Sequence, residues 1–183
     1  YISGNVPLYT TDLTYRISEI LLRDMLHLSK SYLPFDRQEI YTMRKFTKYL
    51  QYGQKKKVGE NTWITLYNAG HIPGSAIVLV EMDGKRIVYT GDFNTISTRL
   101  LDGADPKVLP TLDAIITETT YGNIEHPPRN EIEDGLIKSI YNTLNNRGTA
   151  LIPAFGVGRS HEIMMVLNRD GDTFFPITVD GMA

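Results

Sequence analysis

The sequence contains no cysteine, and histidine and tryptophan are scarce. Without cysteine, the chain has no disulfide scaffold, no cysteine zinc site and no thiol nucleophile. Any metal must therefore be held by histidine and carboxylate side chains. The four histidines are His27, His71, His126 and His161. His27 lies among leucines in a helical pattern, which favours packing or a helix-end charge over metal binding.

Large charge excess and long apolar segments are also absent. Lysine and arginine number 19 and aspartate and glutamate 21, which gives a formal net charge of −2. This balance excludes binding of nucleic acid through bulk positive charge, so any such role needs a local site. No apolar run approaches the ~18 residues of a membrane-spanning helix, and no signal peptide opens the chain. Because the first residue is Tyr1 rather than methionine, we expect a piece of a longer protein.

The first two thirds of the chain pass from helical to strand patterns. Apolar residues recur at helical spacing over residues 13–28, where Thr11 or Asp12 can cap the helix, and a capping-box pattern at residues 36–39 opens a second helix. Aromatic and β-branched residues predict strands at residues 62–69, 76–82, 85–90 and 114–118. Between two of these strands, Asp83-Gly84 is a two-residue sequence typical of a tight hairpin.

A different pattern begins near residue 125. It predicts a helix that Asn130 caps, a buried strand at residues 149–155, a helix at residues 159–167 and a strand at residues 176–179. A strand, a helix and a strand joined through a glycine loop form a βαβ unit and imply a parallel sheet. We therefore predict an α/β protein with a domain boundary near residue 125.

Three side chains that can bind metal or transfer protons lie at the ends of predicted strands. His71 follows residues 62–69, Asp92 follows residues 85–90, and Glu118 closes the strand that begins at residue 114. Loops at the ends of strands on a rigid sheet are where catalytic side chains gather. The plainer alternative is a loop histidine, a turn-forming aspartate and a strand-end charge, and the spacing alone leaves both interpretations open.

A second cluster surrounds the glycine loop before the last predicted helix. Gly156-Val-Gly158 leads into Arg159, and the backbone N–H groups at a helix start favour an anion such as phosphate. The third glycine of the dinucleotide fingerprint is missing, so a structural turn without a ligand is the stronger alternative. Ser160 and His161 point about 100° apart on a helix and do not form a catalytic dyad.

Four motifs taken together, in this order, resemble the metallo-β-lactamase/β-CASP nucleases. They are Ala69-Gly-His-Ile-Pro-Gly-Ser-Ala76, Thr90-Gly-Asp-Phe93, Glu118-Thr-Thr-Tyr-Gly122, and Pro153-Ala-Phe155 followed by Gly158-Arg-Ser-His-Glu162. The sequence is most similar to archaeal homologues of the nuclease subunit of the cleavage and polyadenylation specificity factor. The resemblance implies part of an αββα metallo-β-lactamase domain at residues 1–124 and the start of an α/β β-CASP domain at residues 125–183.

The resemblance assigns metal and catalytic roles to the three strand-end residues. His71 matches the third zinc-binding motif and would ligate one of two zinc ions. Asp92 matches the carboxylate that bridges both ions. Glu118 matches the β-CASP motif whose glutamate orients a histidine that protonates the leaving group. Zinc ions in such a pair activate water for attack on a phosphodiester. The resemblance therefore implies that the parent protein cleaves RNA during 3′-end processing or maturation. Cleavage would be endonucleolytic, with 5′-exonuclease activity left open.

Less specific matches concern the substrate. His126 falls where some relatives carry a histidine, and Gly158, Arg159 and Ser160 lie at the start of the β-CASP segment, where they would contact phosphate. The implied partner is single-stranded RNA and not a membrane. A homodimer is left open, and we expect a cytoplasmic location.

The family's His-x-His-x-Asp-His motif and its later β-CASP histidine motifs are not in this sequence. Because a zinc site needs three or four protein ligands, His71 and Asp92 are an incomplete set, and we expect this piece to be inactive alone. Two alternatives are an inactive partner that binds RNA or braces an active homologue, and a small-molecule hydrolase such as a thioesterase. The segment from Pro153 to Glu162 argues against the hydrolase, since such enzymes lack it.

Overall fold

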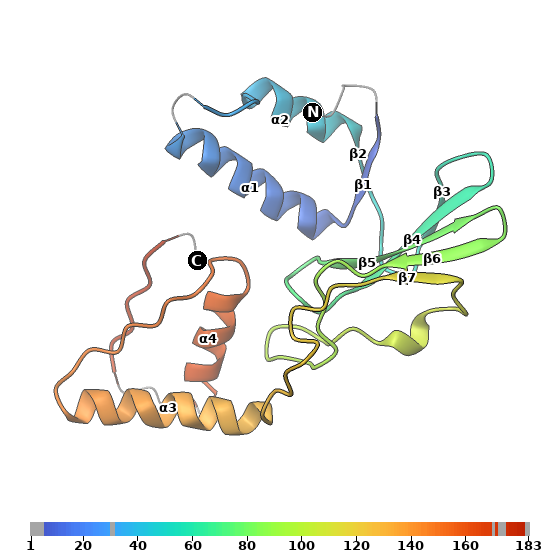
Figure 1. Cartoon of the computed structure of the whole chain (residues 1–183). Helices are drawn as coiled ribbons and strands as arrows, with labels where there is room; N and C mark the ends of the chain where they lie inside the picture. The colour runs from blue at the N-terminus through green and yellow to red at the C-terminus, as the bar shows by residue number, and fades with distance from the viewer. Residues whose placement is uncertain (1–5, 30–31, 170, 172–174, 182–183) are drawn as a thin grey trace. The chain divides into compact units, whose positions relative to one another are not determined.

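The chain forms a mixed α/β structure, described by a computed structural model for residues 6–29, 32–169, 171 and 175–181 (Figure 1). In chain order the elements are β1 (Leu8–Thr10), α1 (Asp12–Leu28), α2 (Arg37–Phe46), β2 (Thr47–Tyr49), β3 (Lys55–Lys57), β4 (Thr62–Asn68), β5 (Ala76–Met82), β6 (Lys85–Tyr89), the 3-10 helix η1 (Pro106–Val108), β7 (Ala114–Ile116), α3 (Arg129–Asn145) and α4 (Arg159–Leu167). None of the described helices has the length and hydrophobicity needed to cross a membrane.

Two compact units divide the chain. The first comprises Tyr1–Ser97 and Leu101–Glu118, and the second comprises Thr98–Leu100 and Thr119–Ala183. The chain thus passes from one unit to the other a few residues before the boundary expected from the sequence. The assignment of residues 125–183 to a β-CASP domain stays a prediction.

A five-stranded sheet is the centre of the first unit, with strand order β3-β4-β5-β6-β7. The pairs from β3 to β6 are antiparallel, and β7 lies parallel to β6. The predicted hairpin is confirmed between β5 and β6, where Asp83 and Gly84 have φ of +48° and +77°. Positive φ at both central residues is what a tight hairpin of this hand requires.

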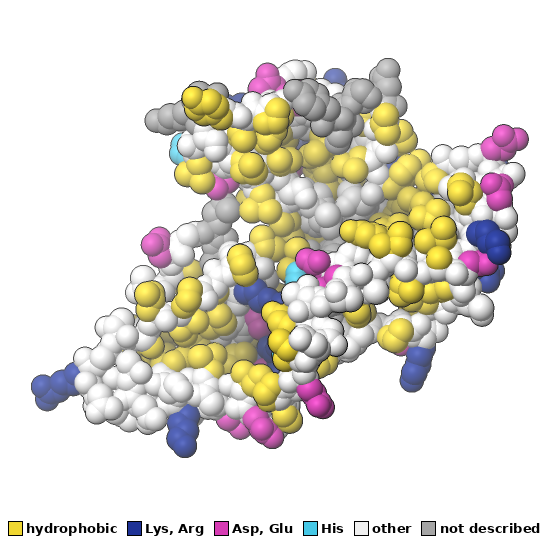
Figure 2. Space-filling model, viewed as in Figure 1, with side chains coloured by type: hydrophobic (Ala, Val, Ile, Leu, Met, Phe, Trp, Pro, Cys, Tyr) yellow, Lys and Arg dark blue, Asp and Glu magenta, His cyan; other side chains and the backbone are white. Residues whose placement is uncertain are grey.

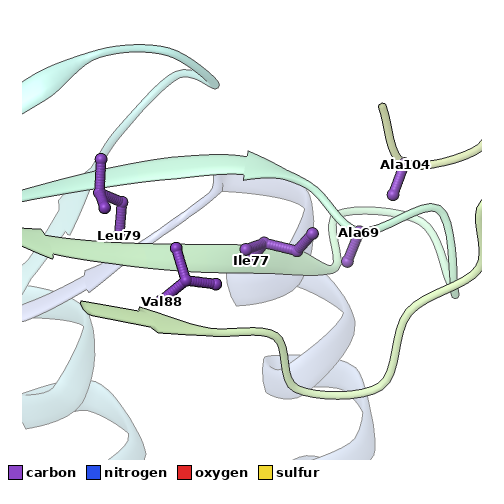
Figure 3. Packing of buried hydrophobic residues seen from close by; sticks show 5 residues of the cluster. All are labelled: Ala69, Ile77, Leu79, Val88 and Ala104. Carbon is purple, nitrogen blue, oxygen red and sulfur yellow. The ribbon is translucent and has the colours of Figure 1, made fainter. Parts of the chain in front are cut away.

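The core of this unit lies on one face of the sheet. Ile77 and Leu79 of β5 and Val88 of β6 pack with Ala69 and Ala104 from the loops, as Figure 3 shows. Side chains alternate between faces along a strand, so Val78, Val80 and Ile87 lie on the opposite face. Figure 2 shows apolar side chains across the sheet region and charged side chains at the hairpin ends.

Helix ends in the first unit follow their sequence signals. The side chain of Thr11, rather than that of Asp12, caps α1 by accepting a hydrogen bond from the N–H of Thr14. Asp36 and Glu39 form the predicted capping box of α2. After α2 the chain enters β2, which pairs in parallel with β1.

In the second unit, the predicted strands at residues 149–155 and 176–179 are wrong. The structure has no regular strand in either range, over the residues that it describes. Leu151 and Phe155, expected in a buried strand, are 91% and 83% exposed. A strand is stabilised by hydrogen bonds to a neighbour, and the described residues of this unit supply none. The βαβ unit is therefore not formed, whereas the helix at residues 159–167 is confirmed as α4.

An ionic network joins α3, α4 and Thr98–Leu100 within the second unit. Its two carboxylates belong to Glu133 and Glu162, which are buried. Arg99 donates to Glu133 through Nε (2.8 Å) and Nη2 (2.7 Å), and Arg129 contacts both glutamates. Glu162 also accepts hydrogen bonds from the backbone N–H groups of Arg99 and Leu100, at 2.9 and 2.8 Å.

The network also sets the charge state of Glu133. Burial alone would raise the pKa of this carboxyl and is the largest single effect, but the hydrogen bonds and charges of Arg99 and Arg129 together hold its pKa below the ordinary value of 4.5. The ionised form is therefore the one that stabilises the fold. This contribution is present above pH 4.5 and is lost as the pH falls through the lowered pKa.

Replacing Glu133 by glutamine should reduce the free energy of unfolding at pH 7 by about 1–3 kcal/mol, because two arginines lose a charged partner. The arginines are partly exposed, which makes this less than the cost of breaking a fully buried pair. The measurement is urea unfolding of the whole chain, with Glu131→Gln on the exposed start of α3 as control. The difference from wild type should shrink as the pH falls below 4.5 and through the lowered pKa, and a constant difference would contradict this account of the network.

Candidate active site

Three strands of the five-stranded sheet end at the same edge. Asn68, the last residue of β4, pairs with Ala76, the first residue of β5. Tyr89, the last residue of β6, pairs with Val78 near the start of β5 and with Ile116, the last residue of β7. The loops that follow β4, β6 and β7 therefore begin side by side, and these loops carry His71, Asp92 and Glu118.

His71 and Asp92 lie close together in the first unit. The His71 Nε2 and Asp92 Oδ2 atoms are 3.7 Å apart. The imidazole is about one third exposed (32%) and the carboxylate largely exposed (70%), so an ion or a ligand can reach both. An imidazole and a carboxylate that are adjacent and open to solvent can share a cation.

Backbone hydrogen bonds hold the two loops against each other. Between the loops, the N–H of Asn94 donates to the carbonyl of Ala69 at 2.8 Å; within the loop after β6, the N–H of Ala104 donates to the carbonyl of Asn94, also at 2.8 Å. The side chain of Asn68 donates to the carbonyl of Asp102 at 2.9 Å and accepts from the N–H of Gly70 at 3.0 Å. The loop after β4 is therefore hydrogen-bonded to Asn94 and to Asp102, which both belong to the loop after β6.

Gly70 is required by this contact. Its φ is +65°, and a Cβ placed there would lie 2.5 Å from the carbonyl oxygen of Asn94 and 2.8 Å from the nitrogen of Ala104. Both atoms belong to backbone and are hydrogen-bonded to each other within the loop after β6, so they cannot move aside without disturbing that bond and the adjacent bond from Asn94 to Ala69. Glycine thus allows the close approach that brings His71 toward Asp92.

Glu118 joins the same edge through the backbone beside Asp92. Its Oε1 accepts a hydrogen bond from the N–H of Phe93 at 3.1 Å. The parallel pairing of β6 and β7 continues one residue further, where the N–H of Thr90 donates to the carbonyl of Ile116 at 3.0 Å. The Glu118 carboxylate is therefore anchored to the residue that follows Asp92.

The loop that carries His71 is closed by Ser75. Its Oγ accepts hydrogen bonds from the N–H groups of His71 and Ile72, each at 3.2 Å. The Tyr52 hydroxyl donates to the carbonyl of Ser75 at 2.8 Å. Partial burial raises the pKa of Tyr52, which keeps this hydroxyl protonated and able to donate.

The donor set fits part of a zinc site. Histidine nitrogen and carboxylate oxygen are both zinc ligands. A zinc site, however, needs either four protein ligands or three protein ligands and a water molecule. Over the described ranges, no group of three or more histidine and acidic side chains is placed to hold a metal ion. His71 and Asp92 therefore supply two donors, and the residues described here do not complete the site.

The remaining predicted site residues lie in the second unit. His126 packs edge-to-face on Tyr121, with ring centroids 4.7 Å apart. Gly158 is the N-cap residue of α4, with φ of +76°, and Arg159 begins the helix as an exposed residue. The Ser160 hydroxyl donates to the carbonyl of Gly156 at 2.7 Å, within its own turn. All four residues belong to the second unit. Their contact with phosphate stays a prediction.

Some residues that shape the site were not identified from the sequence as functional. Asn68 and Ser75 hold the His71 loop through side-chain to backbone hydrogen bonds. The signal available was local, because asparagine and serine two to four residues from a loop amide are typical of such turns. Without a fold, this signal does not distinguish these positions from other polar loop residues.

Comparison with known proteins gives one family match and several relatives. A sequence profile described as the Metallo-beta-lactamase superfamily domain matches residues 2–119. The chain is 38% identical to the probable RNase MJ4 of Methanocaldococcus jannaschii over 98% of this chain and 42% of that protein. It is 41% identical to the transcription termination factor FttA of Pyrococcus horikoshii, over 96% of this chain and 28% of that protein.

A third relative is the RNase aCSPSF2 of Saccharolobus solfataricus. It is 34% identical over 99% of this chain and 36% of that protein. The chain therefore spans less than half the length of each of these three relatives.

The role of Gly70 predicts a specific pattern of stability changes. Gly70→Ala should lower the free energy of unfolding by about 2–4 kcal/mol, from the positive φ and from overlap with the neighbouring loop. Gly53→Ala is the matched control, because Gly53 has φ of +76° but no atom of the described residues beyond its chain neighbours lies within 4 Å of the place that a Cβ would take. Urea unfolding should show a loss of only about 1–2 kcal/mol for the control, and equal losses would show that the loop contact contributes nothing.

Proposed function

Because the chain belongs to the metallo-β-lactamase superfamily, we propose that it is part of a zinc-dependent ribonuclease whose metal site includes His71 and Asp92. The observation that carries the proposal is the 3.7 Å separation of the His71 Nε2 and Asp92 Oδ2 atoms. Glu118, hydrogen-bonded to the N–H of Phe93, would act beside them. Residues 125–183 would begin the β-CASP domain.

The names of the relatives support RNA as the substrate. Two of them are named as RNases and one as a transcription termination factor, and each activity involves RNA. The substrate proposed for the intact parent is single-stranded RNA, cleaved at phosphodiester bonds during 3′-end processing or maturation. The parent would be a hydrolase that acts at internal sites, with 5′-exonuclease action as a further mode.

The residues of this chain would contribute positioning and charge. His71 would offer its Nε2 atom as a ligand, while its own backbone N–H is held by Ser75. Asp92 would offer a carboxylate that is largely exposed to solvent. When bound, zinc ions supply positive charge against the phosphate oxygens and activate a water molecule. Two ions are proposed, and Asp92 would be among the residues that hold them.

Glu118 would act on orientation and on proton transfer. By accepting the N–H of Phe93, it fixes the backbone beside Asp92, and its carboxylate would orient the general acid that protonates the leaving oxygen. Arg159, Gly158 and Ser160 at the start of α4, together with His126, would contact the RNA backbone. A guanidinium is suited to this contact because it binds phosphate through paired hydrogen bonds.

Substitutions in the longer protein that contains this chain test these roles. Asp92→Ala should reduce cleavage of a 5′-labelled single-stranded RNA to background, since it removes a metal ligand. Arg159→Ala should cost about tenfold, the value of one charged hydrogen bond. Near-equal rates for the two variants, each shown to be folded by circular dichroism, would contradict the assignment.

A comparison of the longer protein with this chain alone tests whether the metal site needs ligands from outside this chain. We expect bound zinc and RNA cleavage in the longer protein, loss of cleavage on chelation and its return on adding zinc. We expect neither tight zinc binding nor cleavage by the present chain. Metal analysis and the same RNA assay give both answers, and full cleavage by the present chain would show that His71 and Asp92 are not part of a larger ligand set.

A further inference from the structure

The carbonyl oxygen of Gly74, in the loop that carries His71, is held by the first turn of α1. The hydroxyl of Thr14 donates to it at 2.6 Å, and the hydroxyl of Thr11 lies at 2.9 Å. Thr11 is also 2.9 Å from the Thr14 oxygen, so the two hydroxyls form one small network that ends on this carbonyl. These contacts connect positions 60 and 63 residues apart in sequence.

The backbone of the loop touches the helix directly at this point. Gly74 has φ of +86°, and a Cβ there would lie 2.6 Å from the nitrogen of Thr14 and 2.9 Å from its hydroxyl oxygen. No other residue type fits without displacing the helix. The start of α1 and the His71 loop are thus packed backbone to backbone.

Helix capping alone does not explain Thr14. Thr11 has a local role, because its side chain accepts the N–H of Thr14 at 3.1 Å and caps α1. Thr14 lies in the first turn of α1, where its side chain is not the capping group. Its hydroxyl donates its hydrogen bond to the carbonyl of Gly74 in the loop, while it lies 2.9 Å from the Thr11 hydroxyl, so its own donated bond contributes to the tertiary contact.

The held carbonyl is next to the residue that closes the loop around His71. Gly74 precedes Ser75, whose Oγ accepts the N–H of His71 at 3.2 Å. A displacement of the Gly74 peptide would therefore move the acceptor that fixes the backbone of His71. The carbonyl of Ser75 is held separately by Tyr52, so both peptides on the closing side of the loop are restrained.

From this arrangement we infer that the first turn of α1 sets the position of the His71 imidazole, with Thr14 as the positioning residue and Thr11 as its support. The inference rests on the proposed role of His71 as a zinc ligand. Residues that orient a metal ligand without touching the metal change affinity and activity by about 10- to 100-fold when replaced. Thr14 would act in this way through Gly74 and Ser75.

The test uses the longer protein and four variants. Thr14→Val removes the hydroxyl at nearly constant shape, and Thr14→Ser restores it. Thr42→Val is the matched control, because Thr42 lies in α2 and its hydroxyl donates to the carbonyl of Gln38 in its own helix, at 2.9 Å. His71→Ala tests the underlying function.

The first readout is amide hydrogen exchange of the metal-free protein, followed by mass spectrometry in the peptide that covers residues 69–76. Thr14→Val should speed exchange there about fivefold, the equivalent of one hydrogen bond, while Thr14→Ser and Thr42→Val should match wild type. The second readout is zinc affinity by competition with a chromophoric chelator, together with kcat and KM for RNA.

For Thr14→Val we expect zinc affinity and kcat to fall about 10- to 100-fold with KM unchanged, and Thr14→Ser to restore both. Zinc affinity and kcat equal to those of Thr42→Val would overturn the inference, and so would failure of Thr14→Ser to rescue. The failure of the proposed function looks different: His71→Ala would then bind zinc and cleave RNA like wild type.

Discussion

The contact between the loop after β4 and the loop after β6 is the interaction on which the candidate site depends. It consists of the backbone hydrogen bond from Asn94 to Ala69 and the side-chain hydrogen bond from Asn68 to the carbonyl of Asp102, and Gly70 allows the close approach. Parallel and antiparallel pairing brings the strand ends to one edge, but pairing alone would leave the loops free to diverge. The loop contact fixes them together and so sets the distance between His71 and Asp92.

The two units of the chain are stabilised by different interactions. The first unit is stabilised by an apolar cluster on one face of a five-stranded sheet and by backbone contacts between its loops. The second unit is stabilised in part by charge, because Glu133 and Glu162 are buried and are satisfied by Arg99, Arg129 and two backbone amides. Such a network is costly to break on one side, so it specifies how α3, α4 and Thr98–Leu100 pack within their unit.

Elements with strong local signals were predictable from the sequence. The Asp83-Gly84 hairpin, the capping box at Asp36 and the strands β4 to β7 follow from turn chemistry and from residue type. The strand expected at residues 149–155 was not, because an apolar segment becomes a strand only where a neighbour pairs with it. The matching of family motifs placed His71, Asp92 and Glu118 in one group, and the structure brings them to one sheet edge, while their chemical roles stay predictions. Thr14 could not be found from sequence, since its partner lies 60 residues away.

The central claim is that His71 and Asp92 hold the same zinc ion in the longer protein. The most direct measurement is an anomalous difference map collected at the zinc absorption edge from crystals of that protein. We expect a peak within about 2.0–2.2 Å of both His71 Nε2 and an Asp92 carboxylate oxygen. Zinc bound only by other residues, with neither of these side chains in contact with it, would contradict the claim.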